Sequence, residues 1–567
     1  MKIRTLLLGA AATMAMAPAA MAERGSDGQA NILYFQAVST MNPYLSSGTK
    51  DVEASSLVIE PLAGYDEKGN MFPRLVTELP TVENGGIAAD FKSVTWKLKP
   101  DLKWSDGTPF TSEDVKFTAE YCMNPDGGCA QLAKYDGIDK VEAVDPTTVK
   151  VTFKEAKPFP FTAFVGSESP IVQKAQFTPC MGAAAPTCTD ANFKPIGTGP
   201  FRVTEFRTND VVQLEANPEY RDPAKPAFAT IMLKGGGDAA AAARVVMETG
   251  EYDYAWNTQI APEVQAQMEG GGKGKFVNAF GTLVERIEMN WTDASPDLPE
   301  GERSTKAHPN PFLSDVNVRR ALSMAIDRNL LVEVGYGQAG RPTCNLVPAP
   351  EQYASNDNTG CLTQDIEGAK KLLDEAGWVP GGDGVREKDG QRLSLVYQTS
   401  VNPIRQDFQS LIKQWWSEIG VETELKTVDA SVFFGGDAGS PDTLEKFYAD
   451  VQMYANNFPG TDPEAYLAMY TCDKAPSPDN QWQGENNNRY CDPEYDKLVA
   501  ELSRTSGIDE RGAIARKLND MLTKDSMTVV PLVDRGRLSA HSNALGGVVL
   551  NTWDSELWNA SDWFRVK

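Results

Sequence analysis

The side chains that most enzymes use for proton transfer and nucleophilic attack are scarce in this chain. Its 567 residues include only two histidines, His308 and His541. The sequence contains neither the H-E-x-x-H pair of zinc proteases nor the G-x-S-x-G elbow of serine hydrolases. Nothing singles out a catalytic pair among the 78 acidic residues. We therefore predict no catalytic residue, no metal and no cofactor, and a secreted enzyme is kept only as an alternative from another functional class.

Two short loops instead combine aromatic side chains with neutral amides. Residues 252–257 read Tyr-Asp-Tyr-Ala-Trp-Asn, and residues 454–458 read Tyr-Ala-Asn-Asn-Phe. A cleft lined by aromatic residues and a few placed polar groups suits a small organic ligand. The alternative is that the aromatic residues belong to the core and the asparagines form turns. The sequence leaves both interpretations open.

A glycine-rich segment, Gly197-Thr-Gly-Pro-Phe201, superficially resembles a phosphate-binding loop. Such a loop must open a helix, because the helix N-terminus holds the phosphate. Here Pro200 is followed by an alternation of apolar and polar residues that is typical of a strand. We predict a turn where the chain crosses over, and no nucleotide site.

Composition and charge restrict the class of protein. Apolar residues make up 41% of the chain, which is enough to bury a core, and the length predicts two to four core-bearing units. The net charge is −24, and loss of Lys2 and Arg4 makes it more negative. This charge argues against binding to nucleic acid or to anionic lipid. Solubility is the simpler explanation of the charge, and a cationic ligand is the alternative.

The first 22 residues have the features of a secretory leader. Lys2 and Arg4 give a positive start, a short apolar stretch follows, and Ala20-Met21-Ala22 forms an A-x-A cleavage site. The apolar stretch is shorter than the roughly 20 residues that a membrane span requires. We predict cleavage after Ala22 and export without membrane insertion. The lack of a lipobox cysteine near this site favours a free periplasmic protein.

Eight cysteines in an exported chain indicate disulfides. Eight cysteines allow 105 pairings, but these fall into four couples that are close in sequence, and none forms a C-x-x-C pair. We predict the pairs Cys122–Cys129, Cys180–Cys188, Cys344–Cys361 and Cys472–Cys491.

Helical and strand patterns alternate irregularly along the chain, which predicts an α/β fold. Alternating apolar residues predict strands at 93–99, 148–154 and 421–428. Apolar residues at helical spacing occur at 53–62, 238–250, 365–377 and 408–420. Thr111 and Asp114 form a capping-box-like helix start, and Asp238 and Asp365 are candidate N-caps.

Several ordered blocks resemble one known family. They are residues 60–75, 94–117, 197–201, 312–328 and 491–498. In residues 94–117, the run Trp-Ser-Asp-Gly-Thr-Pro-Phe-Thr-Ser-Glu-Asp-Val is similar to a block of the extracellular solute-binding proteins, family 5 (cluster C). These proteins serve peptide, opine and nickel ABC importers. The resemblance extends over nearly the whole mature chain.

The resemblance implies a bilobed periplasmic-binding-protein fold (type II) with a hinge and an extra domain. It places residues 23–56, 195–285 and 528–567 in domain I, residues 57–194 in the extra domain II, and residues 286–527 in domain III. The hinge is expected near 285–290 and 529–532. The protein is expected to act as a monomer that closes on a small polar organic ligand and then docks on transmembrane permease subunits.

The resemblance also implies binding residues. The loop after the first strand matches Ser47, Gly48 and Thr49, and an aromatic-Asn pair after Gly-Glu-Tyr-Asp matches Trp256 and Asn257. A loop of domain III matches Tyr454, Asn456, Asn457 and Phe458.

One position departs from the pattern of the peptide binders. Those proteins hold the free amine of the ligand with an Asp in the domain III loop, where this chain has Asn456 or Asn457. A buried ammonium needs a counter-charge, which an amide does not supply. The resemblance favours a peptide, and an opine, a sugar derivative or another polar metabolite is the alternative. Free-amine peptides require that another carboxylate take the place of the Asp.

Overall fold

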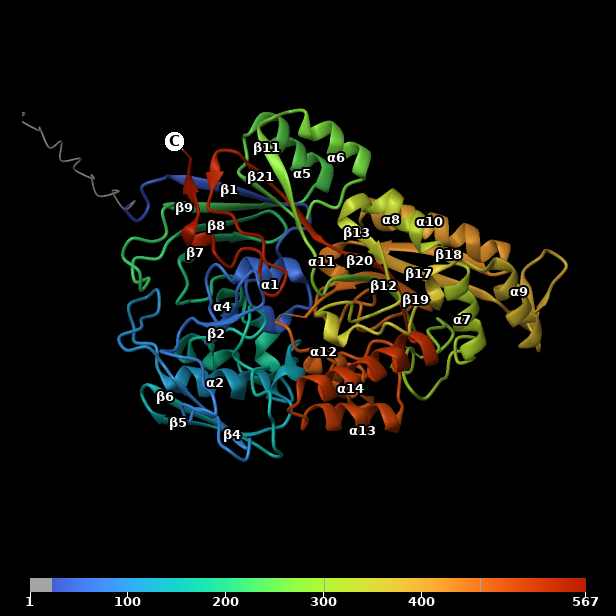
Figure 1. Cartoon of the computed structure of the whole chain (residues 1–567), viewed down its shortest axis with the longest axis horizontal. Helices are drawn as coiled ribbons and strands as arrows, with labels where there is room; N and C mark the ends of the chain where they lie inside the picture. The colour runs from blue at the N-terminus through green and yellow to red at the C-terminus, as the bar shows by residue number, and fades with distance from the viewer. Residues whose placement is uncertain (1–22, 300, 459, 567) are drawn as a thin grey trace, which may run out of the picture.

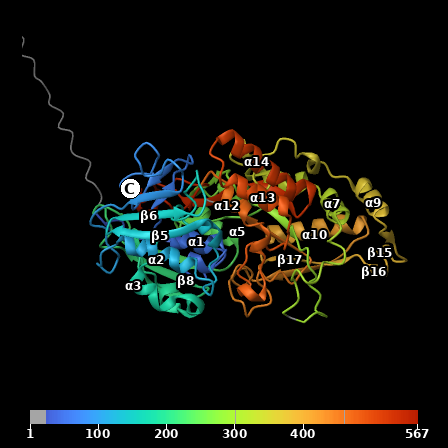
Figure 2. The same cartoon turned by 90° about the horizontal axis from the view of Figure 1, so that it is seen from below.

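The computed structural model describes residues 23–299, 301–458 and 460–566, and the predicted leader lies outside the described residues. The chain forms two lobes that lie side by side, each built on its own large sheet (Figure 1). In the view from below, α2 (Ser112–Cys122) lies in one lobe and α7 (Val316–Met324) lies in the other (Figure 2). The C-terminal strand β23 (Phe564–Arg565) returns to the first lobe and pairs with β22 (Leu545–Gly546).

The first lobe contains a seven-stranded sheet with the order β11-β21-β10-β1-β9-β8-β7. Strand β1 pairs in parallel with both β9 and β10, and the other pairings are antiparallel. Helices α5 and α6 lie beside this sheet at the top of Figure 1. The bounds are β1 (Gln29–Tyr34), β7 (Phe201–Arg207), β8 (Val211–Ala216), β9 (Thr230–Gly235), β10 (Tyr254–Trp256), β11 (Gly274–Ala279), β21 (Arg537–Ser542), α5 (Ala239–Arg244) and α6 (Pro262–Glu269).

The second lobe contains a six-stranded sheet with the order β13-β20-β12-β19-β17-β18. Helices α8 and α10 lie on one side of it, and α13 and α14 lie on the other (Figure 1). The fully buried side chains Phe408, Ile412 and Trp416 of α10 pack in the core of this lobe. The bounds are β12 (Val284–Met289), β13 (Gly340–Pro342), β17 (Ser394–Ser400), β18 (Glu422–Val428), β19 (Val451–Asn456), β20 (Val529–Arg535), α8 (Arg328–Gly335), α9 (Ile366–Glu375), α10 (Pro403–Glu418), α13 (Pro493–Leu502) and α14 (Ile508–Asp520).

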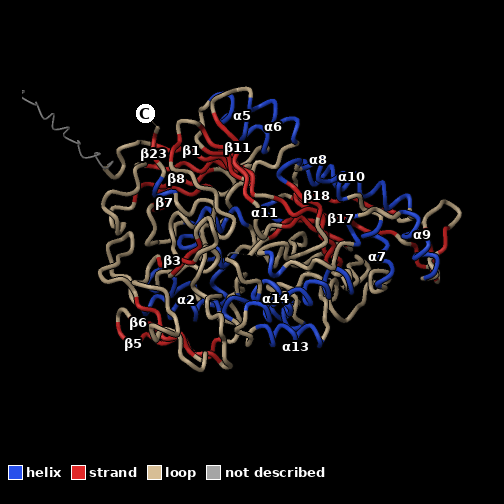
Figure 3. The backbone as a smooth tube through the Cα atoms, in the orientation of Figure 1, coloured by secondary structure: helices blue, strands red, loops and turns tan. Residues whose placement is uncertain are grey.

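A smaller sheet and long loops extend the first lobe. The sheet has the order β4-β6-β5, with β4 (Ser93–Lys97), β5 (Ile138–Asp145) and β6 (Thr148–Phe153). Figure 3 shows strands at the centre of each lobe and much loop structure in this lower part of the first lobe. Helix α2 begins with the predicted capping box, because Thr111 and Asp114 each hydrogen-bond the backbone of the other.

Two short segments connect the lobes. Strands β11 and β21 belong to the first sheet, whereas β12 and β20 belong to the second. The chain therefore passes between the lobes at residues 280–283 and at Gly536. The predicted hinge segments, 285–290 and 529–532, overlap β12 and β20, and the predicted domain boundary after residue 285 falls within β12. These residues are held in place because β12 and β20 pair with each other.

The other local predictions agree with the structure, with two exceptions. Asp238 and Asp365 cap their helices by accepting hydrogen bonds from Ala241 and Gly368. The apolar pattern at 53–62 is not one helix, because α1 spans Thr49–Ser55 and ends before most of that pattern. The segments 252–257 and 454–458, predicted as loops, instead lie largely in β10 and β19.

The segment that begins at Gly197 forms a turn before β7. Its glycines are needed for close packing, since a Cβ on Gly197 would lie 1.8 Å from the carbonyl oxygen of Val58. Gly199 also donates its backbone N–H to that oxygen at 2.8 Å. The prediction of a turn is confirmed.

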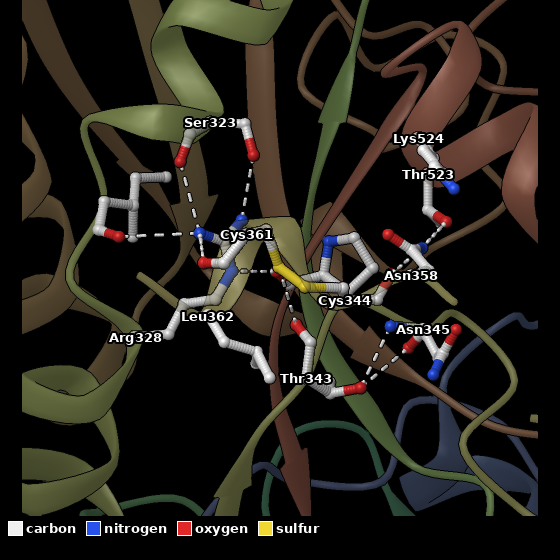
Figure 4. The surroundings of a disulfide bond; sticks show 12 residues. Ser323, Arg328, Thr343, Cys344, Asn345, Asn358, Cys361, Leu362, Thr523 and Lys524 are labelled. Atoms are coloured by element: carbon white, nitrogen blue, oxygen red, sulfur yellow. Dashed lines mark hydrogen bonds between the residues drawn. A yellow bond between two sulfur atoms is a disulfide. The ribbon is translucent and has the colours of Figure 1, made fainter. Parts of the chain in front are cut away.

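All four predicted disulfides are present. Figure 4 shows the pair Cys344–Cys361, which joins segments held by polar contacts. Arg328 donates to the carbonyl oxygen of Cys361 at 3.0 Å, and Asn358 donates to the carbonyl oxygen of Cys344 at 2.8 Å. Each bridge closes a short loop, with sequence separations from 7 to 19.

Candidate functional site

A cavity of about 110 Å³ lies where the two lobes face each other. Its lining comes from both lobes, and all nine predicted binding residues contribute to it. They are Ser47, Gly48, Thr49, Trp256, Asn257, Tyr454, Asn456, Asn457 and Phe458.

The ends of two strands position most of these side chains. Trp256 is the last residue of β10, and Asn257 directly follows it. Asn456 is the last residue of β19, and Asn457 directly follows it. Asn257 has a positive φ of 51°, which turns the chain away from the sheet. Ligands of open α/β sheets bind in the crevice beyond the carboxyl ends of the strands, and the cavity lies beyond the ends of β10 and β19.

The aromatic residues belong both to the core and to the cavity wall. Trp256 is only 2% exposed, stacks on Tyr34 at 4.5 Å between ring centroids, and donates its indole N–H to Glu53 at 2.9 Å. Tyr454 and Phe458 are also buried. All three line the cavity as well. The interpretation as core residues therefore holds, and their contact with a ligand stays a prediction.

The polar residues predicted from the sequence supply neutral groups. Asn257 accepts hydrogen bonds of 3.3 Å from both terminal nitrogens of Arg535. The side-chain oxygen of Asn456 accepts from the backbone N–H of Asn457 at 3.0 Å. Ser47 donates to Glu445 at 3.2 Å. None of these predicted residues carries a charge.

The sequence analysis missed the charged groups of the cavity. They come from segments that are far apart in the chain and lie in no recognisable motif. They are Lys50, Glu53, Lys134, Glu168, Arg405, Glu445, Glu485, Arg535, Arg537 and Glu556.

Two arginines share one carboxylate in the second lobe. Arg405 pairs with Glu285 at 2.6 Å, and Arg535 lies 3.7 Å from the other oxygen of Glu285. Burial alone would raise the pKa of Glu285, but the two guanidinium groups outweigh it and lower this pKa. The Nε of Arg535 is buried without a hydrogen-bond partner among the described residues. This group has one positive charge in excess, so it can attract an anionic part of a ligand.

A second buried cluster lies in the first lobe. Arg537 pairs with Glu53, and Glu556 accepts hydrogen bonds from Tyr254 at 2.5 Å and Ser539 at 2.6 Å. Burial, opposed by Arg537 and reinforced by Glu556, raises the pKa of Glu53 to about 8. These contacts hold Trp256 and the wall around it in place.

Glu445 is a buried acid of the cavity with one oxygen unpartnered among the described residues. It is 7% exposed, and its Oε2 has no hydrogen-bond partner among the described residues. Burial raises the pKa of Glu445 to about 7, although hydrogen bonds, including that from Ser47, oppose the effect.

Comparison with known proteins identifies the family. The model of the bacterial extracellular solute-binding proteins, family 5 Middle, matches residues 73–477. The glutathione-binding protein GsiB of Shigella boydii is 25% identical over 511 residues, which cover 90% of this chain and 89% of that protein. GsiB of Escherichia coli K12 is also 25% identical, over 510 residues.

Solved structures have the same fold. The oligopeptide-binding protein AppA of Bacillus subtilis, in complex with a nonapeptide, gives a TM-score of 0.81 at 20% identity and covers 96% of this chain and 100% of that one. NikZ of Campylobacter jejuni, in complex with Ni(L-His), gives 0.78 at 22% identity and covers 95% and 99%. The predicted type II periplasmic-binding-protein fold is confirmed.

Within the described residues, no helix combines the length and the apolar character that a membrane crossing requires. The family match covers well over half of the chain, and the curated relatives align with most of its length. The chain belongs to the bacterial extracellular solute-binding proteins of family 5, which are the solute-binding components of ABC importers.

Proposed function

We propose that the mature chain is a monomeric periplasmic receptor that captures a peptide-class ligand between its lobes. It delivers the ligand, chemically unchanged, to the transmembrane permease subunits of an ABC importer. The proposal includes removal of residues 1–22 as a leader, with cleavage after Ala22. An opine or a sugar derivative is the alternative ligand class.

The observation that carries the proposal is a cavity lined by both lobes. Contacts between the lobes surround it: Ser46 forms a β-bridge with Gly435, and Lys474 pairs with Asp136 at 2.9 Å. A ligand that touches both walls favours the closed state by its differential affinity for that state. Closure is the signal that a permease can recognise.

The proposed hinge consists of the two connecting segments, residues 280–283 and Gly536. Hinges are short loop segments that absorb a change in backbone angles. In the proposed division, residues 57–194 form the extra domain II on the first lobe. Domains I and III meet at the two connecting segments.

The ligand class follows from the chemistry of the cavity. Aromatic walls and side-chain amides suit the body of a small organic molecule. The excess positive charge of Arg405 and Arg535 over Glu285 suits a carboxylate. Among the relatives, GsiB is named for glutathione, and the AppA structure contains a nonapeptide. A short peptide combines these features.

A thermal-shift screen of the mature protein tests this function. The probes are glutathione, a mixture of peptides of two to five residues, an opine, a set of sugars and Ni(L-His). A ligand at a hundred times its dissociation constant should stabilise the protein by about 2.7 kcal/mol. Mass spectrometry of the recovered ligand should find it intact, and small-angle scattering should detect compaction. Conversion of a probe into product, without any stabilising ligand, would contradict the receptor.

A further inference from the structure

Glu445 is a buried carboxylate among the residues that line the cavity, and one of its oxygens has no hydrogen-bond partner among the described residues. Along the chain, Glu445 falls in the segment that connects α11 (Ala430–Phe433) to β19 in the second lobe. Its Oε1 accepts the hydrogen bond from Ser47 of the first lobe, while its Oε2 has no partner among the described residues. Within the same described part of the chain, no Lys or Arg forms an ion pair with this side chain.

Arg489 lies beside Glu445, and its guanidinium group hydrogen-bonds backbone carbonyl oxygens. Arg489 donates to the backbone carbonyl oxygens of Glu445 and Lys446, at 2.7 and 3.3 Å, and also to that of Ser304 at 2.8 Å. It therefore anchors the main chain around Glu445, and its charge opposes the rise in the pKa of Glu445 without forming an ion pair with the carboxylate. A buried carboxylate without a paired counter-ion is costly. A cation supplied by the ligand would remove that cost.

We propose that Glu445 is the counter-ion for an ammonium group of the ligand, and that Ser47 holds its carboxylate in place. This inference rests on the proposed receptor function and narrows the ligand to one with a free amine. The neutral side chains Asn456 and Asn457 line the same cavity but cannot supply this charge.

The arginine group completes the recognition of a zwitterion. Glu445 and Arg535 line the same cavity but share no hydrogen-bond or ion-pair partner among the described residues. The amine of the ligand would meet Glu445, and its carboxylate would meet Arg535. A short peptide with both termini free, or a derivative of an amino acid, has this pattern of charge.

Asp534 of β20 provides a matched control outside the cavity. It is 7% exposed, and its Oδ1 has no hydrogen-bond partner among the described residues. Glu485 is the competing carboxylate, because it lines the cavity and its Oε2 has no hydrogen-bond partner among the described residues either. Burial raises the pKa of Glu485 to about 7, although Lys474 and Lys134 oppose this shift. Glu485 is less deeply buried than Glu445, so leaving it without a counter-ion costs less.

The test compares Glu445→Gln, the competing variant Glu485→Gln and the control Asp534→Asn with the unmodified protein. The probes are the peptide mixture and the same mixture after N-acetylation, which removes the ammonium group. Glutamine keeps the size of the side chain and an acceptor for Ser47. Circular dichroism and ligand-free melting establish that each variant folds.

We expect the unmodified protein and Asp534→Asn to bind the free-amine mixture and to bind the acetylated mixture at least about tenfold more weakly. Glu445→Gln should bind the free-amine mixture at least about tenfold more weakly than the unmodified protein. Equal binding of both mixtures, or full binding by Glu445→Gln, would overturn the role of Glu445 and keep the receptor. Loss of binding in Glu485→Gln alone would assign the amine to Glu485 instead.

Binding of a sugar or another ligand without an amine, with no response to either peptide mixture, would also overturn this inference. The receptor function would survive that result. If no probe binds and no ligand co-purifies, the proposed function itself fails. The two failures are therefore distinguishable.

Discussion

The hydroxyl of Ser47 donates a hydrogen bond of 3.2 Å to Oε1 of Glu445, and the two residues belong to different lobes. This contact joins the two lobes at the cavity wall, so the proposed closure of the lobes would form it. It also holds one oxygen of a carboxylate whose other oxygen has no hydrogen-bond partner among the described residues.

Ser47→Ala should weaken ligand binding. The variant removes one hydrogen bond to a carboxylate, which contributes about 1.5–3 kcal/mol when the bond forms with a charged group. Isothermal titration calorimetry with a ligand found in the thermal-shift screen measures the change in dissociation constant. Ser56→Ala is the control, because Ser56 bonds Ser555 at 2.9 Å within the first lobe. Equal affinity of the Ser47 variant and the unmodified protein would contradict the coupling.

Glu445→Gln should stabilise the ligand-free protein at neutral pH. Burial raises the pKa of Glu445 from 4.5 to about 7, so between these values the unfolded chain releases a proton that the folded protein retains. The unmodified protein therefore loses stability relative to the variant as pH rises through this window. The difference reaches about 3 kcal/mol above pH 7. Urea unfolding at several pH values measures it.

The difference between the two proteins isolates Glu445, since the other titrating groups are common to both. Below the ordinary pKa of 4.5, their stabilities should agree. A difference in unfolding free energy that stays constant across the whole pH range would show that the substitution acts through packing and not through ionisation.

Arg535→Gln should weaken binding of ligands with a free carboxylate. Glu285 keeps its 2.6 Å partner Arg405 in this variant, so the buried carboxylate remains paired. We expect a loss of at least about tenfold in affinity for free-carboxylate peptides and a smaller change for C-terminal amides. Competition binding with the two peptide forms measures the ratio. Arg392→Gln, which alters an ion-pair group outside the cavity, serves as control, and an unchanged ratio would exclude Arg535 as the anion site.

Removal of the Cys344–Cys361 disulfide should reduce stability. The bridge spans a sequence separation of 17, and a loop of about this length contributes roughly 3 kcal/mol by restricting the unfolded chain. The double variant Cys344→Ser with Cys361→Ser should unfold at lower denaturant concentration, as followed by tryptophan fluorescence. An unchanged midpoint would mean that the contacts of Arg328 and Asn358 hold the loop without the bridge.

Local features of the sequence predicted much of the fold. The capping box of Thr111 and Asp114, the N-caps Asp238 and Asp365, and the four short cysteine spacings each depend on neighbours close in the chain. The aromatic and amide loops at 252–257 and 454–458 could be recognised for the same reason. Their composition indicated cavity-lining residues, but it did not show that 254–256 and 451–456 form strands.

The sequence by itself determined several of the helices and strands, the disulfide pairs and the neutral lining of the cavity. Only the tertiary structure decided the positions of the charges, because Glu285, Arg405, Glu445 and Arg535 come together from distant segments. It also decided which charge lacks a partner, since that depends on burial and on distances between the lobes. The connections at 280–283 and Gly536 were likewise set by strand pairing between β12 and β20, which no local pattern specifies.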